Sequence, residues 1–203
     1  MMMLLENEDQ CEMIDFKNYC DLEYKSEIFS SLIECYKKVF FEAEYWRETY
    51  TTSEVKEKLK KELTGDAALR LVVLNDAQGS FKQVIAFCWA QCLFGFEIVD
   101  SFFLIHYINT DTNIKREDIE HLVDNSKFLY LNDLGVINDY KNLFSLGDLI
   151  MPVLSQVAIM SNVDTLFFWC IRNTPAALIS KAGRMEIIAE FDDIQFFKCK
   201  VYT

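Results

Sequence analysis

The chain has 203 residues, of which 51% are apolar and 26% are charged. This composition predicts one compact globular domain, or at most two small ones, with a buried core, and it excludes a disordered or collagen-like protein. Acidic residues outnumber basic ones by 32 to 20, which makes the net charge −12. Such a charge repels polyanions, so we expect no nucleic-acid partner. No stretch approaches the roughly 18 uninterrupted apolar residues that a membrane span needs, so we expect no membrane segment.

The cysteines and the N-terminal residues predict a cytoplasmic protein. The seven cysteines are an odd number, none forms a Cys-x-x-Cys pair, and several lie in apolar runs, so we expect reduced core thiols. His106 and His121 lie far from any cysteine pair, which argues against a zinc site. The first five residues are too short for the apolar part of a signal peptide and are followed by acidic residues. No export signal is therefore expected.

The first half of the chain predicts two helices and a β-hairpin. Apolar residues recur at three- and four-residue steps over residues 27–41, which is the spacing of one helix face. Hydroxyl N-caps and early acids predict a second helix over residues 52–64. A short apolar run over residues 69–74, a turn sequence and a long β-branched and aromatic run over residues 81–94 together predict the hairpin.

The lysines of the second predicted helix form a basic cluster in an acidic chain. They are Lys56, Lys58, Lys60 and Lys61, and Glu54, Glu57 and Glu62 alternate with them. Opposite charges at helical spacing are typical of an exposed helix face, so we interpret this cluster as solvated.

The middle of the chain leads to a strand that is important for the function. Over residues 95–112 periodicity does not decide between helix and strand. Asn113 can cap a short helix that ends near residue 124. Residues 128–137 are then mostly apolar and predict a buried strand. Gly135 within it indicates either a bulge or a point where another group comes close to the backbone.

The last third of the chain predicts a helix, a strand, a second helix and a closing hairpin. These cover residues 146–160, 165–171, 175–181, and 185–191 with 195–201. Pro152 is unusual inside the long helix and should kink it or mark a later start.

A strand, a polar loop over residues 138–142 and the start of the long helix form a segment suited to a phosphate. Ser145 and Gly147 are small, and Lys141 supplies a mobile cation. A helix start offers unpaired backbone N–H groups and the positive end of the helix dipole, both of which favour an anion. Strand-to-helix turns with small residues are also common in proteins that bind no phosphate, so the local sequence leaves both interpretations open.

The order of these elements, from about residue 27 to residue 201, resembles the GNAT superfamily of acyl-CoA-dependent N-acetyltransferases. The pyrophosphate loop of that family has the form Gln/Arg-x-x-Gly-x-Gly/Ala. The segment Asn142-Leu143-Phe144-Ser145-Leu146-Gly147 matches its spacing, with asparagine at the first position and serine in place of the first glycine. The match is degenerate but retains Gly147.

A second segment, residues 172–184, looks like the family's Asn-x-x-Ala-x-x-Tyr-x-Lys-x-Gly-Phe segment, which flanks the pantetheine arm. Asn173, Lys181 and Gly183 fit this pattern. Ile179 and Arg184 stand where the family has tyrosine and phenylalanine. Because that tyrosine often protonates the leaving thiolate, Ile179 leaves the acid to another donor or to water, or leaves the protein without turnover.

The resemblance implies an α/β (α+β) fold with a mixed, mostly antiparallel central sheet flanked by helices, whose fourth and fifth strands splay apart. It implies a single domain over residues 1–203, with an N-terminal strand or extension over residues 1–25 and a variable insert over residues 95–126. The acyl donor would be acetyl-CoA. The backbone of Leu134 to Val136 would pair with the pantetheine amides like an added strand, and the backbone amides of Leu143 to Gly147 would cradle the pyrophosphate. The implied cofactor-binding residues are Leu134, Val136, Lys141, Asn142, Leu143, Phe144, Ser145, Leu146, Gly147 and Asn173.

Acyl transfer to an amine requires a general base, because an ammonium has no lone pair. Asp133 is the first candidate, since it lies next to the strand position that would face the thioester; the alternative is a solvated or hydrogen-bonded strand-end carboxylate. His106 is the second candidate, because its usual pKa lies near neutrality, and it could equally be a structural histidine. Glu97 and Asp100 either line an acceptor pocket or are simply exposed.

We therefore expect an N-acetyltransferase that transfers an acetyl group from acetyl-CoA to an amine of a small molecule or peptide by direct attack. One alternative is a degenerate protein that binds CoA or regulates without turnover, and another is an acyltransferase that uses a longer acyl-CoA or an acyl carrier protein. The expected partners are acetyl-CoA and an amine acceptor, with no nucleic acid, no membrane and no metal, and homodimerisation is left open.

Overall fold

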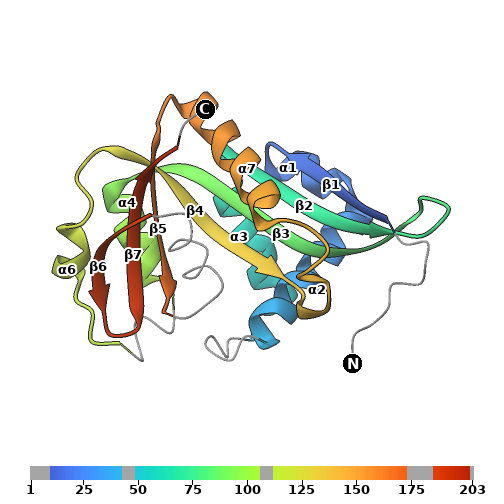
Figure 1. The fold of residues 1–203 in the computed structure, drawn as a ribbon, viewed down its shortest axis with the longest axis horizontal. Coiled ribbons are helices and arrows are strands. Elements are labelled where there is room, and N and C mark those ends of the chain that lie inside the picture. The colour runs from blue at the N-terminus through green and yellow to red at the C-terminus, as the bar shows by residue number, and fades with distance from the viewer. Residues whose placement is uncertain (1–9, 43–48, 106–111, 173–184, 202–203) are drawn as a thin grey trace. The chain divides into compact units, whose positions relative to one another are not determined.

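The computed structural model describes residues 10–42, 49–105, 112–172 and 185–201. In this part of the chain, seven strands form one sheet in the order β1-β2-β3-β4-β5-β7-β6 (Figure 1). Strand β4 pairs with β5 in parallel, whereas the β1–β2, β2–β3, β5–β7 and β6–β7 pairs are antiparallel. The predicted mixed, mostly antiparallel sheet flanked by helices is confirmed.

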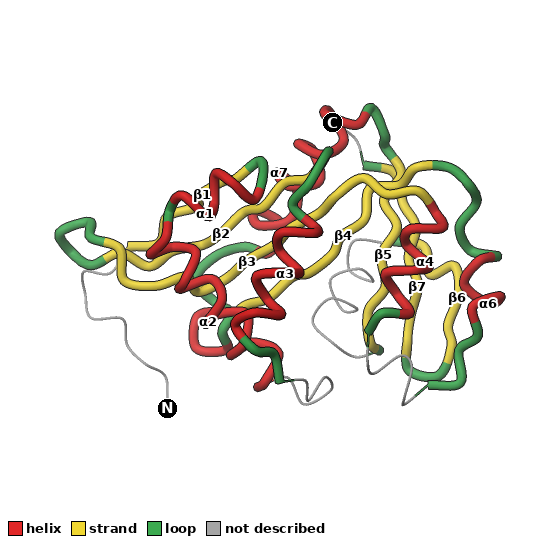
Figure 2. Tube along the Cα trace, turned by 180° about the vertical axis from the view of Figure 1, so that it is seen from behind, coloured by secondary structure: helices red, strands yellow, loops and turns green. Residues whose placement is uncertain are grey.

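The chain divides into two compact units, of which the first comprises residues 1–91 and 132–157. Its elements are β1 (Gln10–Phe16), α1 (Tyr19–Tyr24), α2 (Ser26–Glu42), α3 (Thr52–Glu62), β2 (Ala67–Asn75), most of β3 (Phe81–Phe94), the second half of β4 (Lys127–Val136), the 3-10 helix η1 (Asn138–Tyr140) and most of α7 (Leu146–Ser161). Helix α7 lies over one face of these strands, and α2 and α3 lie over the other face (Figures 1 and 2).

Helices α2 and α3 form where helical periodicity predicted them. The apolar face of α2 buries Phe29, Leu32 and Tyr36 against the sheet. Helix α3 begins with a capping box: the Thr51 hydroxyl accepts from the Glu54 amide, and the Glu54 carboxylate accepts from the Thr51 amide at 2.7 Å. Both predicted helices are confirmed, with ends that differ by one or two residues.

The two faces of β2 carry different side chains because successive residues on a strand point to opposite faces. Leu69, Leu71 and Val73 belong to the core shared with α2 and α3. Arg70 lies on the other face, where its guanidinium donates to the Asp148 carbonyl of α7 at 2.9 Å. Arg70 also forms a bidentate ion pair with Asp15 of β1, at 2.6 and 2.7 Å. It therefore joins β1, β2 and α7.

Pro152 lies in the interior of α7, which begins at Leu146. Of the two alternatives offered for Pro152, a later start of the helix is therefore wrong. Proline has no N–H group, so the Asp148 carbonyl four residues earlier has no helical donor. The Arg70 guanidinium donates to this carbonyl instead, and the helix continues past the proline to Ser161.

The second unit comprises residues 92–131 and 158–203. Its elements are α4 (Gly95–Phe103), α6 (Arg116–Glu120), β5 (Thr165–Ile171), β6 (Glu186–Phe191) and β7 (Ile194–Lys200). Its core is aromatic, with Phe102, Phe128, Phe167 and Phe196 fully buried or nearly so. The predicted strand over residues 165–171 and the closing hairpin are confirmed.

Two expectations about the second unit are resolved or corrected. The undecided segment after residue 94 begins as helix α4, whose Ile98, Val99 and Phe102 are buried at helical spacing. The helix expected to start at Asn113 spans only Arg116–Glu120. The Asn113 amide donates to Asp192 at 3.2 Å, because this segment packs against the β6–β7 turn before it becomes helical.

The seven cysteines all lie among the described residues and form no disulfide there, but they are not uniformly core residues. Cys35, Cys88 and Cys170 are buried, whereas Cys11 and Cys20 are exposed, because they lie on the outer strand β1 and the short helix α1. The expectation of core thiols is therefore wrong for these two residues.

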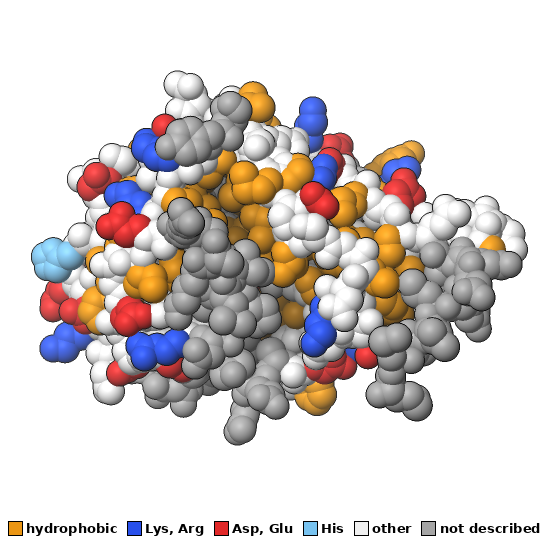
Figure 3. All heavy atoms as spheres, in the orientation of Figure 1, with side chains coloured by type: hydrophobic (Ala, Val, Ile, Leu, Met, Phe, Trp, Pro, Cys, Tyr) orange, Lys and Arg blue, Asp and Glu red, His pale blue; other side chains and the backbone are white. Residues whose placement is uncertain are grey.

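Among the helices that the structure describes, none is both long enough and apolar enough to cross a membrane. Hydrophobic side chains are nevertheless exposed around α7 on the face seen in Figure 3. The exposed hydrophobic residues of α7 are Met151, Ile159 and Met160, and Ile159 retains 73% of its exposure.

Candidate active site

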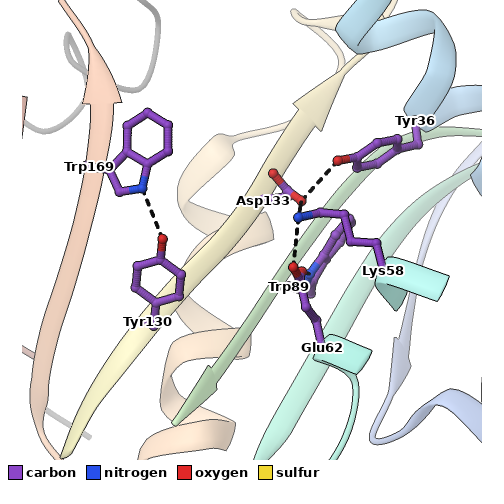
Figure 4. A network of polar contacts seen from close by, with 7 residues as sticks. All are labelled: Tyr36, Lys58, Glu62, Trp89, Tyr130, Asp133 and Trp169. Carbon is purple, nitrogen blue, oxygen red and sulfur yellow. Dashed lines mark hydrogen bonds and ion pairs between the residues drawn. The ribbon is translucent and has the colours of Figure 1, made fainter. Parts of the chain in front are cut away.

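Asp133 lies in the second half of β4, with its carboxylate on the face that α2 and α3 cover (Figure 4). Two groups contact its Oδ2 atom: the Tyr36 hydroxyl donates to it at 3.3 Å, and the Lys58 ammonium lies 3.2 Å away. No described residue contacts Oδ1. The side chain retains 15% of its exposure. One carboxylate oxygen is therefore held by the protein, and the other is open to a further partner.

Lys58 of α3 connects Asp133 to a second carboxylate, that of Glu62, which lies on the same helix as Lys58. Its Nζ atom lies 2.8 Å from Glu62 Oε1, one turn further along α3. Glu62 is held in turn at Oε2 by the indole N–H of Trp89, which donates at 2.7 Å. The side chains of Lys58 and Glu62 retain 29% and 14% of their exposure. Two carboxylates therefore share one ammonium in a half-buried cluster.

This cluster raises the pKa of Asp133 to about 7. Burial is the largest cause, because it disfavours the charged form, and the nearby Glu62 carboxylate adds to it; Lys58 and the hydrogen bond from Tyr36 act in the opposite direction. Burial opposes the charge on Lys58, but Asp133 and Glu62 outweigh it and raise the pKa of this ammonium. Asp133 can therefore exchange a proton near neutral pH, while Lys58 stays charged.

Gly135 explains how aromatic rings fit beneath this strand. A Cβ atom at this position would lie 2.2 Å from the Phe87 ring, much closer than atoms can pack. Phe87 stacks with Tyr36 at 5.4 Å between ring centroids and lies 5.3 Å from Trp89. Of the two interpretations offered for Gly135, close approach of another group is therefore the one observed. The glycine lets Tyr36 and Trp89 reach the carboxylates.

The predicted phosphate-binding segment lies after β4 in the same unit. Its residues are exposed or half-buried, and α7 begins at Leu146. Two of its amides are already bonded: the Leu143 amide donates to the Tyr140 carbonyl at 3.0 Å, and the Gly147 amide donates to the Ser145 hydroxyl at 3.1 Å. The expectation that all five amides from 143 to 147 are available is therefore wrong. Serine at the glycine position caps the helix itself.

Three amides of this segment, those of Phe144, Ser145 and Leu146, have no acceptor among the described residues. Lys141 and Asn142 are exposed beside them. Unpaired N–H groups at the start of a helix of 16 residues, next to a lysine, retain the features that favour an anion. The segment therefore offers a smaller set of donors than the sequence predicted.

Leu134 and Val136 lie at the end of the strand order of the first unit. The parallel ladder of β4 with β5 joins Leu129 with Leu166 and Tyr130 with Phe167, and these four residues belong to the second unit. Within the first unit, β3 is the neighbour of β4, so Leu134 and Val136 have one strand edge without a partner in that unit.

The remaining candidates lie elsewhere or outside the described residues. His106 and Asn173 fall on residues that the structure does not describe, as do Ile179, Lys181, Gly183 and Arg184. Glu97 accepts from the Phe94 amide at 2.8 Å and so caps α4. Asp100 pairs with Arg116 at 2.9 Å. Both carboxylates therefore have structural roles in the second unit.

Tyr36, Lys58 and Glu62 are residues of this cluster that no sequence motif indicated. Lys58 and Glu62 were interpreted as part of an exposed face, and this is wrong, because both are half-buried beside Asp133. Their spacing held a signal: Val55, Lys58, Leu59 and Glu62 follow the i, i+3, i+4, i+7 pattern, so they share a face with the two buried apolar residues of α3.

Comparison with known proteins identifies the fold of this chain. No protein-family model matches the sequence, and no curated protein matches it. Many solved structures are similar to this chain in fold, and three of them are described. A variant of an agmatine N-acetyltransferase has a TM-score of 0.56 at 12% identity, over 93% of this chain and 99% of that one. A GNAT-family acetyltransferase from Streptococcus pneumoniae has a TM-score of 0.55 at 11% identity, over 94% and 100%.

The third structure is the polyamine N-acetyltransferase of Drosophila melanogaster, with a TM-score of 0.52 at 14% identity, over 93% of this chain and 100% of that one. All three similarities extend over nearly the whole length of both chains. The chain therefore has the fold of the GNAT acetyltransferases.

Proposed function

We propose that this protein is an N-acetyltransferase that transfers the acetyl group of acetyl-CoA to an amine of a small molecule or peptide. The Asp133 carboxylate is the observation that carries the proposal. It is held through Oδ2, open at Oδ1, and its pKa is raised to about 7. A general base works best when its pKa lies near the working pH. The fold, which is that of acetyltransferases, supports the same reaction.

In this reaction Asp133 accepts a proton from the ammonium of the acceptor. The freed lone pair attacks the thioester carbonyl carbon, a C–N bond forms and the C–S bond breaks. The departing thiolate takes up a proton, for which the second N–H proton of the attacking nitrogen is sufficient. This balance requires no tyrosine, so Ile179 at the family's tyrosine position is compatible with turnover. One proton is released to solvent for each acetyl group transferred.

The first unit also has groups suited to the acyl donor. The strand edge at Leu134 and Val136 has no partner among the described residues of the first unit, and it is suited to bind the pantetheine amides as an added strand does. The amides of Phe144, Ser145 and Leu146, which have no acceptor in the described part of the chain, are suited to the pyrophosphate, with Lys141 and Asn142 beside them. Asn173 remains a candidate from the family pattern.

The acceptor is proposed to be a cationic amine. The net charge of −12 attracts cations at long range. Two of the similar structures are an agmatine N-acetyltransferase and an enzyme that forms N-acetylagmatine. Agmatine and polyamines are therefore the first amines to test, followed by peptides with a free N-terminus or lysine.

The test combines binding with turnover. Calorimetry should show acetyl-CoA binding, and an amine panel should release free CoA thiol. Asp133→Asn should reduce kcat/KM by about 10² to 10⁴, the usual contribution of a general base. Glu57→Gln, on the exposed side of the same helix as Lys58, is the matched control and should leave kcat/KM unchanged. Unchanged turnover in Asp133→Asn would eliminate Asp133 as the base.

A second candidate is a CoA-binding protein without turnover. The bonded amides of Leu143 and Gly147 favour it, because they weaken the donor set of the loop. Binding of acetyl-CoA without thiol release for any amine would select this candidate. Release with octanoyl-CoA but not with acetyl-CoA would instead select a longer acyl donor. Absence of binding at millimolar acetyl-CoA would contradict both candidates and the main proposal.

A further inference from the structure

The cluster around Asp133 contains more acidic groups than basic ones. Asp133 and Glu62 are two carboxylates, and Lys58 is the one ammonium that contacts both, at 3.2 and 2.8 Å (Figure 4). If all three were ionised, the cluster would carry one excess negative charge in a half-buried place. Burial makes such a charge costly, so the cluster favours holding one proton.

The contacts determine which carboxylate is held more tightly. Glu62 accepts from Lys58 at 2.8 Å and from Trp89 at 2.7 Å, one contact on each oxygen. Asp133 accepts from Lys58 at 3.2 Å and from Tyr36 at 3.3 Å, both on Oδ2. Shorter charge-assisted hydrogen bonds are stronger, so Lys58 interacts more strongly with Glu62 than with Asp133. The labile proton of the cluster is therefore that of Asp133.

We propose that Glu62 and Lys58 are positioning residues that set the pH at which Asp133 takes up the proton of the acceptor amine. Glu62 anchors the Lys58 ammonium, and Lys58 reaches Asp133 on Oδ2, which leaves Oδ1 toward the acceptor. The negative charge of Glu62 strengthens the hold of Asp133 on a proton, and the positive charge of Lys58 weakens it. This inference rests on the proposed function, because it names the groups that tune the proposed base.

Among the described residues, the other titratable groups that influence Asp133 do not change charge near neutral pH. Tyr36 of α2 donates to its carboxylate, whereas Cys88 of β3 pairs with Arg70 of β2 in the sheet and so lies on the other face of the sheet. Burial raises the pKa of Tyr36 well above its usual value, and Asp133 raises it further. Burial and Asp133 likewise raise the pKa of the Cys88 thiol. Both groups stay neutral, so the pH response of the cluster near pH 7 is the gain or loss of one proton.

The experiment follows the Asp133 carboxyl carbon by NMR in protein with labelled aspartate, with its signal identified by its loss in Asp133→Asn. Glu62→Gln should lower the titration midpoint of Asp133 by about one pH unit, a tenfold weaker hold on the proton. Lys58→Met should raise the midpoint by a similar amount. Lys58→Arg keeps the positive charge, so it should leave the midpoint near the wild-type value. Opposite shifts from two residues one turn apart are not expected from a general loss of packing.

Two matched controls lie on the same helix. Glu57→Gln and Lys60→Met remove the same charges from exposed positions of α3, and each should leave the midpoint in place. Shifts of equal sign in Glu62→Gln and Lys58→Met, or no shift in either, would overturn the inference. If Lys58→Met does not fold, Glu62→Gln and Lys58→Arg still decide, since the first must lower the midpoint and the second must keep it near the wild-type value.

A kinetic measurement separates this inference from the proposed function. In active protein, the acidic limb of the kcat/KM profile should move with the NMR midpoint in each variant. Opposite NMR shifts in a protein that acetylates no amine would refute the proposed function while the tuning of Asp133 by Glu62 and Lys58 stands. If the protein turns over but none of these variants moves the acidic limb of its kcat/KM profile, the inference is refuted and the proposed function stands.

Discussion

At the scale of single residues, Asp133 connects the candidate chemistry to stability. Its pKa is raised to about 7 in the folded protein, whereas an aspartate in the unfolded chain titrates near its usual value of 3.8. Between these two values the folded state holds a proton that the unfolded state has lost. The contribution of Asp133 to the free energy of unfolding is therefore largest at low pH, and it decreases as the pH rises toward 7.

Asp133→Asn should remove this pH dependence. The asparagine keeps a similar shape and cannot titrate, and Lys58 retains its ion pair with Glu62. Relative to the variant, the wild-type free energy of unfolding should fall by about 1.4 kcal/mol per pH unit between pH 4 and 7, and then level off. Urea unfolding of both proteins at several pH values measures this difference. A difference that grows with pH would show that the pKa of Asp133 is lowered in the folded protein.

At the scale of elements, α7 depends on a contact from another strand. Pro152 removes the helical donor for the Asp148 carbonyl, and Arg70 of β2 replaces it. The same helix begins at the loop proposed to hold the pyrophosphate. The ion pair of Arg70 with Asp15 fixes the guanidinium at its other side, so β1, β2 and α7 are stabilised together.

A double-mutant cycle tests this compensation. Arg70→Met should destabilise the protein by about 1 to 3 kcal/mol, because it removes the charged donor to both the Asp148 carbonyl and the Asp15 carboxylate. Pro152→Ala supplies a helical N–H to that carbonyl. In this background Arg70→Met should cost less, with a coupling of about 0.5 to 3 kcal/mol in urea unfolding. Additive effects would mean that Arg70 stabilises the protein through Asp15 alone.

The start of α7 carries a second prediction. The Ser145 hydroxyl occupies the Gly147 amide, one of the donors that the family loop offers to pyrophosphate. Ser145→Gly should free this amide and tighten acetyl-CoA binding by up to about tenfold, while lowering stability by only a few tenths of a kcal/mol. Calorimetry measures the affinity, with Ser161→Gly at the other end of α7 as the control. Weaker binding in Ser145→Gly would indicate that the hydroxyl itself contacts the ligand.

At the scale of the whole molecule, the net charge of −12 acts differently on the two proposed substrates. Acetyl-CoA is a polyanion and is repelled at long range, whereas a cationic amine is attracted. Salt screens both interactions, since the Debye length shortens from about 30 Å at 0.01 M to about 10 Å at 0.1 M.

Raising the salt concentration over this range should therefore speed the association of acetyl-CoA and slow that of agmatine. Stopped-flow binding measures the first, and kcat/KM for the amine reports the second. Slower acetyl-CoA association at higher salt would instead show that the local field of Lys141 and the helix start outweighs the net charge.

The sequence alone predicted the elements that depend on local patterns. The helices α2 and α3, the β2–β3 hairpin and strand β5 follow from hydrophobic period, capping residues and turn chemistry, all of which are properties of neighbouring residues. The order of these elements was sufficient to predict the fold. The sequence also indicated Asp133 and the segment before α7 as candidate sites, and their roles remain predictions.

What the sequence could not determine depends on contacts between distant residues. It left open whether a bulge or a close neighbour explains Gly135, and only the tertiary structure placed the Phe87 ring against it. It predicted that Lys58 and Glu62 are exposed, because the spacing of charges on a helix does not determine which helix face packs against the sheet. Folding brought them to Asp133, more than 70 positions away along the chain. The proton affinity of that carboxylate is therefore a property of tertiary burial and charge.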